Sequence, residues 1–168
     1  MPGPAAEPAT TIPPLIAPKK VIYFDMAYNP TTNPIIQIED DEDDQFLVSK
    51  ALTELFVPNP VHFFQNGQAA LDYLLTASEQ PLVILCDINM PLMNGLELRD
   101  QIDANPYLRE KAIPFIFFTT SASADLVRAA YQGSIQGFHQ KEQTFERLKE
   151  QLNLIISYWK NCLHPNSF

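Results

Sequence analysis

The sequence is poor in cysteine, glycine and basic residues, and each shortage excludes a class of protein. Its two cysteines, Cys86 and Cys162, lie far apart without C-x-x-C spacing, which argues against a disulfide framework and a zinc site. With 5 glycines it contains neither G-x-G-x-x-G nor G-x-x-x-x-G-K-[ST], the phosphate-binding loops of nucleotide-binding proteins. Only 11 basic residues accompany 20 acidic ones, and a net charge of −9 disfavours nucleic acid as a partner.

Long apolar runs are also missing. No segment approaches the roughly 20 consecutive apolar residues that a membrane helix needs, and the N-terminus lacks the charged start and apolar stretch of a signal peptide. The three histidines are scattered and lack metal-ligand spacing. Because 46% of the 168 residues are hydrophobic, the composition is globular, and we expect a soluble, cytoplasmic protein of one domain with no membrane partner.

Proline is abundant but unevenly distributed. Seven of the 15 prolines precede residue 34. Each removes a backbone donor and fixes φ, so residues 1–33 are expected to form a mostly disordered leader. Within it, residues 21–24 (Val-Ile-Tyr-Phe) alone have strand character. They are interpreted either as a docking segment or added edge strand or, as we favour, as a short apolar stretch in a loose terminus. The domain is expected at 34–160, with a short tail at 161–168.

From residue 34 onward, short apolar runs alternate with amphipathic stretches. The apolar runs predict five strands, at 34–38, 61–64, 82–86, 115–118 and 134–139. Apolar residues at the 3.6-residue period predict five helices, with faces at 47–55, 70–75, 95–105, 123–132 and 145–159. This alternation indicates an α/β fold with a doubly wound parallel sheet. Functional residues are then expected beyond the carboxyl ends of the strands.

Acidic residues follow the first and third predicted strands. Residues 39–44 are six acids in a row, and the last four suit a helix N-terminus, where carboxylates cap free N–H groups. Glu39 and Asp40 are not explained in that way, because like charges held together are costly without a cation. A hard cation such as Mg²⁺ is the simplest candidate. Asp87 follows the third strand and would, taken alone, be a turn or capping aspartate.

Hydroxyl and ammonium groups follow the fourth and fifth predicted strands. Thr119, Thr120 and Ser121 would each be helix caps if taken singly, and Lys141 would be a solvated surface residue. The hydroxyl groups, the ammonium group and the acids are all expected at one edge of one sheet, where together they can carry out one kind of chemistry. They can bind Mg²⁺, present a nucleophilic carboxylate and neutralise a phosphoryl group.

Four motifs on successive strand–helix units resemble the receiver domain of two-component response regulators, the family of CheY. They are Ile-Glu-Asp-Asp at 38–41, Leu-Cys-Asp-Ile-Asn-Met-Pro at 85–91 with Asn-Gly at 94–95, Phe-Thr-Thr-Ser at 118–121, and Gly-Phe-His-Gln-Lys at 137–141. The resemblance covers about 34–160 and implies a flavodoxin-like sheet of order 2-1-3-4-5. It is greatest to the stand-alone receivers that partner phytochrome-type or hybrid histidine kinases.

The resemblance implies a phosphoacceptor and a metal site. Asp87 would attack the phosphorus of a kinase phosphohistidine and become an acyl phosphate. Asp40 and Asp87 would bind Mg²⁺ through their carboxylates, Asn89 through its backbone carbonyl, and Glu39 through water.

The resemblance also implies a switch. Thr119 would hydrogen-bond a phosphoryl oxygen, Lys141 would pair with another, and Phe138 would turn inward as Thr119 moves. The surface expected to change is the last helix with the strand and helix before it. Two residues depart from the family pattern. Glu142 stands where a proline usually follows the lysine. The direction in which Lys141 points, and whether it pairs with Glu142, therefore stay open. Thr120 replaces a small residue and narrows access to the acyl phosphate.

The function implied is a phosphorylation-switched response regulator, not an enzyme that turns over a substrate. Its partner would be a sensor or hybrid histidine kinase, with a phosphotransfer protein as a further candidate, and a homodimer stays open. Eight residues follow residue 160, so no output domain is expected. The alternative is a phosphorylation-independent interaction module of the same fold, against which the complete set of site residues argues. An aspartyl phosphatase of the haloacid dehalogenase type is disfavoured, because its nucleophile follows the first strand whereas Asp87 follows the third.

Overall fold

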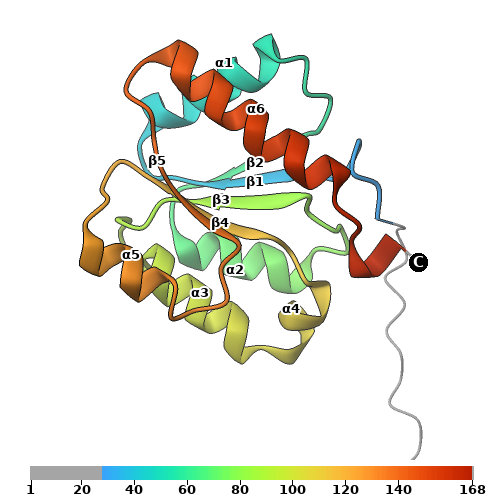
Figure 1. Cartoon of the computed structure of the whole chain (residues 1–168). Helices are drawn as coiled ribbons and strands as arrows, with labels where there is room; N and C mark the ends of the chain where they lie inside the picture. Colours follow the sequence, from blue (N-terminus) through green and yellow to red (C-terminus); the bar gives the residue numbers. More distant parts are fainter. Residues whose placement is uncertain (1–27, 168) are drawn as a thin grey trace, which may run out of the picture.

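The computed structural model describes residues 28–167, and these form a five-stranded sheet between two layers of helices (Figure 1). All four neighbouring strand pairs are parallel, and the strand order is β2-β1-β3-β4-β5. The strands are β1 (Ile35–Ile38), β2 (Val61–Phe64), β3 (Val83–Cys86), β4 (Phe115–Thr119) and β5 (Gly137–Gln140). The predicted fold class and strand order are therefore confirmed.

The helices divide between the two faces of the sheet. Helices α1 and α6 cover one face, and α2 to α5 cover the other (Figure 1). Their bounds are α1 (Glu42–Glu54), α2 (Gly67–Thr76), α3 (Gly95–Ala104), α4 (Pro106–Lys111), α5 (Ala124–Ala130) and α6 (Phe145–Asn161), followed by a 3-10 turn at Pro165–Ser167. None of the helices in residues 28–167 is long and apolar enough to span a membrane.

The central strands consist mostly of apolar residues because helices cover both faces of the sheet, and Gln37 of β1 and Thr119 of β4 are the polar exceptions. Every residue of β1, β3 and β4 is buried. Successive side chains point to opposite faces, so Ile36 and Ile38 of β1 join the core under α2 and α3, whereas Ile35 joins the core under α1 and α6. Two residues of the predicted helix faces, Leu47 and Leu75, are instead 36% and 40% exposed, because they lie at the edges of their apolar stripes.

The structure contains six α-helices in residues 28–167 where five were predicted, and the additional one is α4. The predicted helix at 95–105 ends because the residue before a proline disfavours helical geometry. Asn105 is extended (φ −96°, ψ 113°), and its side chain accepts hydrogen bonds from the backbone N–H groups of Tyr107 (3.0 Å) and Leu108 (3.2 Å). With Pro106 in the first turn, this cap starts a new helix.

The two ends of the described chain meet at a buried histidine. His164 lies in the predicted tail 161–168, is 5% exposed and stacks on Tyr28 at 4.2 Å between ring centroids. Its Nε2 donates to the Ala112 carbonyl oxygen (3.1 Å), and its Nδ1 accepts from the Asn166 N–H (3.1 Å). An accepting Nδ1 requires the neutral imidazole. Residues 1–27, with the 21–24 segment and most of the predicted leader, lie outside the described residues.

We expect the stability of the chain to depend on the protonation of His164. Burial lowers the pKa of His164 from its ordinary value of 6.5, against the opposing effect of its hydrogen bond to Ala112. The folded state therefore binds this proton less readily than the unfolded state, and the stability that neutral His164 contributes is complete above pH 6.5 and lost as the pH falls below it. Urea unfolding at about pH 7.5 and about pH 5.5 should show a smaller pH dependence in His164→Gln than in the wild type. Equal pH dependence in both proteins would contradict this expectation.

Candidate functional site

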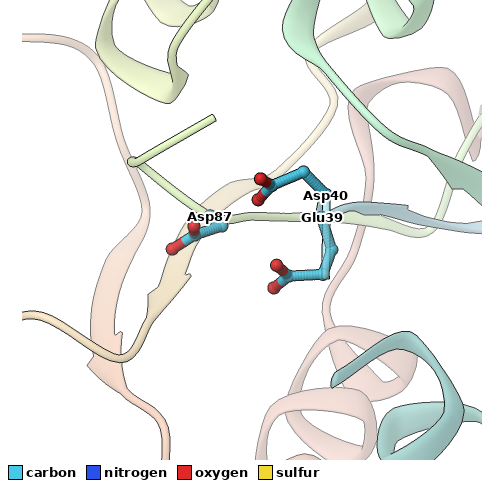
Figure 2. Close-up of side chains that lie close together, drawn as sticks. All are labelled: Glu39, Asp40 and Asp87. Carbon is cyan, nitrogen blue, oxygen red and sulfur yellow. The ribbon is translucent and has the colours of Figure 1, made fainter. Parts of the chain in front are cut away.

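Strands β1 and β3 bring three carboxylates together at the carboxyl edge of the sheet. The strands are neighbours in register, with Ile38 opposite Cys86, so the residues that follow them lie side by side. The Asp87 N–H donates to the Ile38 carbonyl oxygen (2.9 Å) and fixes this register beyond the strands. Glu39, Asp40 and Asp87 each offer an oxygen atom, and these atoms all lie within 4.8 Å of one another. Figure 2 shows the three side chains pointing to the same side of this edge.

The three acids differ in their exposure and partners. Glu39 is 3% and Asp87 8% exposed, whereas Asp40 is exposed. The Oδ1 atom of Asp87 is buried and has no hydrogen-bond donor among residues 28–167. Buried polar atoms are almost always paired, and an unpaired carboxylate oxygen is especially costly. This oxygen therefore requires a partner from outside the described residues, either a donor or a cation.

Lys141 lies between two acids at the same edge. It directly follows β5, and its backbone N–H donates to the Thr119 carbonyl oxygen (2.8 Å). Its Nζ forms ion pairs with Glu39, at the end of β1, and with Asp44 (2.6 Å), in the first turn of α1. Burial alone would lower the pKa of Lys141, but the hydrogen bonds to Asp44 and Glu39 outweigh it and raise the pKa. The ammonium group is therefore charged.

Negative charge remains in excess around this lysine. Lys141 pairs with Glu39 and Asp44, and Glu39 also lies beside the carboxylates of Asp40 and Asp87, so this edge holds four carboxylates and one ammonium group. Burial raises the pKa of Glu39, the Lys141 hydrogen bond and charge lower it, and the Asp87 charge raises it again, with a net upward shift. A further cation at the three-carboxylate group would relieve this repulsion.

The structure shows the direction of Lys141 that Glu142 left open. Lys141 turns toward Glu39 and Asp44, and Glu142 instead lies 3.8 Å from Arg147. The pairing of Lys141 with Glu142, one of the two options in the sequence, is therefore not formed.

The other predicted residues occupy distinct positions around this edge. Thr119, the last residue of β4, is fully buried, and its Oγ1 accepts a long hydrogen bond from the Ser121 N–H (3.4 Å). Thr120 is exposed, as is Asn89 in the loop between β3 and α3. Phe138 of β5 lies in register with Phe117 of β4, with 6.1 Å between ring centroids, in the core under α2 and α3. The roles of these residues in phosphoryl binding and switching stay predictions.

Two site residues were missed in the sequence. Asp44 was interpreted as part of a helix cap, and its separation of 97 residues from Lys141 gives no local pattern. Gly95 was quoted as part of the Asn-Gly motif at 94–95, but it also supports the loop that contains Asp87. Its N–H donates to the Ile88 carbonyl oxygen (2.9 Å), and a Cβ atom here would lie 2.4 Å from the Asp87 carbonyl oxygen. Only glycine permits this approach.

Known proteins resemble the chain in both sequence and structure. Residues 35–153 match the family described as the response regulator receiver domain. The chain is 33% identical over 129 residues to the probable methanogenesis regulatory protein FilR2 of Methanothrix harundinacea, covering 74% of this chain and 82% of that protein. It is 30% identical over 130 residues to the response regulator Rcp1 of Synechocystis, and the match covers 74% of this chain and 87% of that protein. The structure of the phosphorylated cyanobacterial phytochrome response regulator RcpA matches with a TM-score of 0.71 and 27% identity, covering 79% and 97%. The structure of the Mn²⁺-bound form of Rcp1 matches with a TM-score of 0.69 and 28% identity, and it too covers 79% of this chain and 97% of that chain.

We expect Gly95→Ala to destabilise the protein through the Asp87 loop. The added methyl group must displace the backbone of Asp87, and overpacking of this kind costs about 1–3 kcal/mol. Gly133→Ala is the matched control, because its Cβ would meet no atom closer than 3.4 Å, and its effect should stay within about 1 kcal/mol. Urea unfolding measures both. Equal free energies of unfolding for the two variants would show that the Asp87 loop can move to admit the methyl group without loss of stability.

Proposed function

Because the chain belongs to the response regulator receiver domain family, we propose that it is a response regulator of a two-component phosphorelay that accepts a phosphoryl group on Asp87. One observation carries this proposal. The carboxylate of Asp87 is buried, has an oxygen without a donor among residues 28–167, and lies beside the carboxylates of Glu39 and Asp40. A buried carboxylate with an unpaired oxygen, close to other carboxylates, is typical of a site that binds a ligand.

The residues at this edge fit Mg²⁺. Carboxylate oxygens are the ligands that hard divalent cations prefer, and the unpaired Oδ1 of Asp87 lacks a positive partner. Asp40 and Asp87 would bind the ion directly, Asn89 through its backbone carbonyl, and Glu39 through water. Similarity to the Mn²⁺-bound form of Rcp1 supports a cation of this class. When bound, the cation neutralises charge on the carboxylates and on the phosphoryl oxygens.

The proposed donor is the phosphohistidine of a histidine kinase. A carboxylate oxygen of Asp87 forms a bond to phosphorus while the P–N bond of the phosphohistidine breaks. The imidazole leaves with the electron pair of that bond, and Asp87 becomes an acyl phosphate. No hydrogen bond from residues 28–167 to Asp87 Oδ1 has to be broken beforehand.

Lys141 and Thr119 are suited to hold the transferred group. Glu39 keeps the Lys141 ammonium at the edge where Asp87 lies, so a phosphoryl oxygen on Asp87 competes with Glu39 and Asp44 for it. Thr119 Oγ1 accepts its bond from the Ser121 N–H, which leaves the hydroxyl hydrogen free to donate to a phosphoryl oxygen. Both residues stand at strand ends, where a shift moves the loops that follow.

The response of the protein is proposed to spread through β5. Phe138 would turn inward as Thr119 moves, and the surface formed by α5, β5 and α6 would change its partners. The partner that supplies the phosphoryl group is a sensor or hybrid histidine kinase, in the cytoplasm, and a phosphotransfer protein or a second copy of the chain is a further candidate. No external substrate is turned over.

Phosphorylation can be tested by intact-protein mass after incubation with acetyl phosphate. We expect a gain of about 80 Da, one phosphoryl group replacing a proton, in Mg²⁺ and not in EDTA. Asp87→Asn should show no gain although it remains folded, because an amide oxygen cannot form the acyl phosphate. Asp125→Asn, at an exposed site on α5, is the control that should behave like the wild type.

Two results would contradict this function. An undiminished mass gain in Asp87→Asn would move the phosphoacceptor elsewhere. No gain from acetyl phosphate or from a purified histidine kinase, together with no Mg²⁺ binding, would favour the phosphorylation-independent interaction module.

The metal site is tested by Mg²⁺ titration calorimetry. Asp40→Asn should weaken Mg²⁺ binding by at least the roughly 10- to 100-fold that follows loss of a supporting partner at a metal site. Asp43→Asn removes the same charge from the same acidic run but lies outside the three-carboxylate group, so its affinity should stay close to the wild type. Equal weakening in both variants would indicate that general charge, and not direct ligation, attracts the ion.

A further inference from the structure

An apolar groove lies between β5 and the C-terminal half of α6, apart from the acidic site. It has a volume of about 420 Å³, and its lining includes His139 of β5 with Leu154, Tyr158 and Trp159 of α6. Leu154 and Tyr158 are 72% and 63% exposed, so two large apolar side chains face solvent at its rim. Gathered apolar side chains on a surface are typical of a contact site.

The strand beside this groove has a free edge. β5 pairs with β4 on one side, and no strand in residues 28–167 pairs with its other side. The backbone groups of an unpaired edge favour addition of another extended segment. An extended segment laid along such an edge places alternate side chains toward the neighbouring surface, which here is the groove.

Residues 21–24 have the composition that this groove accepts. They are Val, Ile, Tyr and Phe, all of which favour extended conformations and bury large apolar side chains. Six prolines lie within residues 1–18, so little else in the leader suits a strand. Lys19 and Lys20 precede the segment, and residues 34–168 carry the whole net charge of −9, which attracts these lysines to the folded body.

The segment starts within reach of the groove. The described chain begins at Tyr28, which stacks on His164 just beyond the end of α6. Figure 1 shows this start of the chain beside the C-terminal end of α6. Trp159 lies about 3 Å of helical rise before the end of α6 at Asn161, and the three residues from 161 to 164 span at most about 11 Å, so Trp159 is within about 14 Å of His164. The four residues from 24 to 28 span up to about 14 Å, which is enough to cover this distance. The groove begins at this end of α6.

We propose that residues 21–24 dock in the groove between β5 and α6 of their own chain. The chain then covers Leu154 and Tyr158 with its own N-terminal segment and closes the free edge of β5. This inference goes beyond the proposed phosphorylation and does not depend on it. It assigns to the segment the docking role that was the less favoured interpretation of the sequence.

Trp159 is the only tryptophan in the chain, so its fluorescence reports on the groove alone. In the full-length chain, the double variant Ile22→Ser, Phe24→Ser removes two apolar side chains of the segment. We expect the acrylamide quenching constant of Trp159 at least to double and its emission to shift to longer wavelength. The matched control, Leu15→Ser with Ile16→Ser, removes two apolar side chains outside the segment and should leave both quantities unchanged. Identical quenching in the wild type and both variants would overturn the proposal.

Disulfide formation tests whether the contact lies within one chain. In a Cys162→Ser background, Tyr23→Cys with Leu154→Cys should form a disulfide in the monomer. Tyr23→Cys with Leu75→Cys, on the opposite face of the sheet, should not. Equal disulfide formation in both cysteine pairs would overturn the docking. It would also be overturned by a disulfide that joins two chains, together with protection of Trp159 from acrylamide that increases with protein concentration. The latter result would instead assign the groove to a second copy.

Discussion

The ion pairs of Lys141 with Glu39 and Asp44 join three parts of the chain at the carboxyl edge of the sheet. Glu39 follows β1, Asp44 lies in the first turn of α1, and Lys141 follows β5, so one ammonium group connects residues about 100 positions apart. Without it, the carboxylates at this edge would repel one another at close range. Breaking a buried pair by removing one partner costs about 3–5 kcal/mol in general. Lys141 therefore offsets part of the repulsion among the carboxylates at this edge, and the proposed phosphoryl group would have to compete with Glu39 and Asp44 for it.

The parallel sheet supplies the rigid frame for this charge. β1 and β3 are buried on both faces, and their register brings Glu39, Asp40 and Asp87 to one edge without any contribution from flexible side chains. The loop after β3 is fixed in turn by Gly95, whose N–H bonds the Ile88 carbonyl and whose missing side chain admits the Asp87 backbone. Apolar burial thus sets the positions of the residues at the strand ends. The carboxylates of Asp40 and Asp87 meet there through short side chains, whereas Lys141 reaches Glu39 and Asp44 through its long side chain.

Sequence patterns predicted the sheet and the site edge because both rest on local signals. Uninterrupted apolar runs indicate strands covered on both faces, and polar residues directly after them must share an edge. The missed features depend on contacts between distant residues or on a single backbone conformation. Asp44 meets Lys141 only in the folded chain, and the Asn105 cap with Pro106 starts α4, an additional helix beyond the one predicted at 95–105. His164 lies in a segment without periodicity, and its burial arises from stacking on Tyr28, 136 positions earlier in the chain.

Strand β5 links the acidic edge to the groove on α6. Its successive side chains face opposite sides, so Phe138 packs against Phe117 in the core under α2 and α3, whereas His139 lines the groove with α6. The Gln140 carbonyl accepts a hydrogen bond from Gln151 of α6 (2.9 Å), and Lys141 follows at once. A change in the partners of Lys141 must therefore act on the strand that carries both side chains. Under the proposed switch, the acidic edge and the groove would act on the same strand, and a segment bound in the groove would in turn influence the acidic edge, because coupling between two sites is reciprocal.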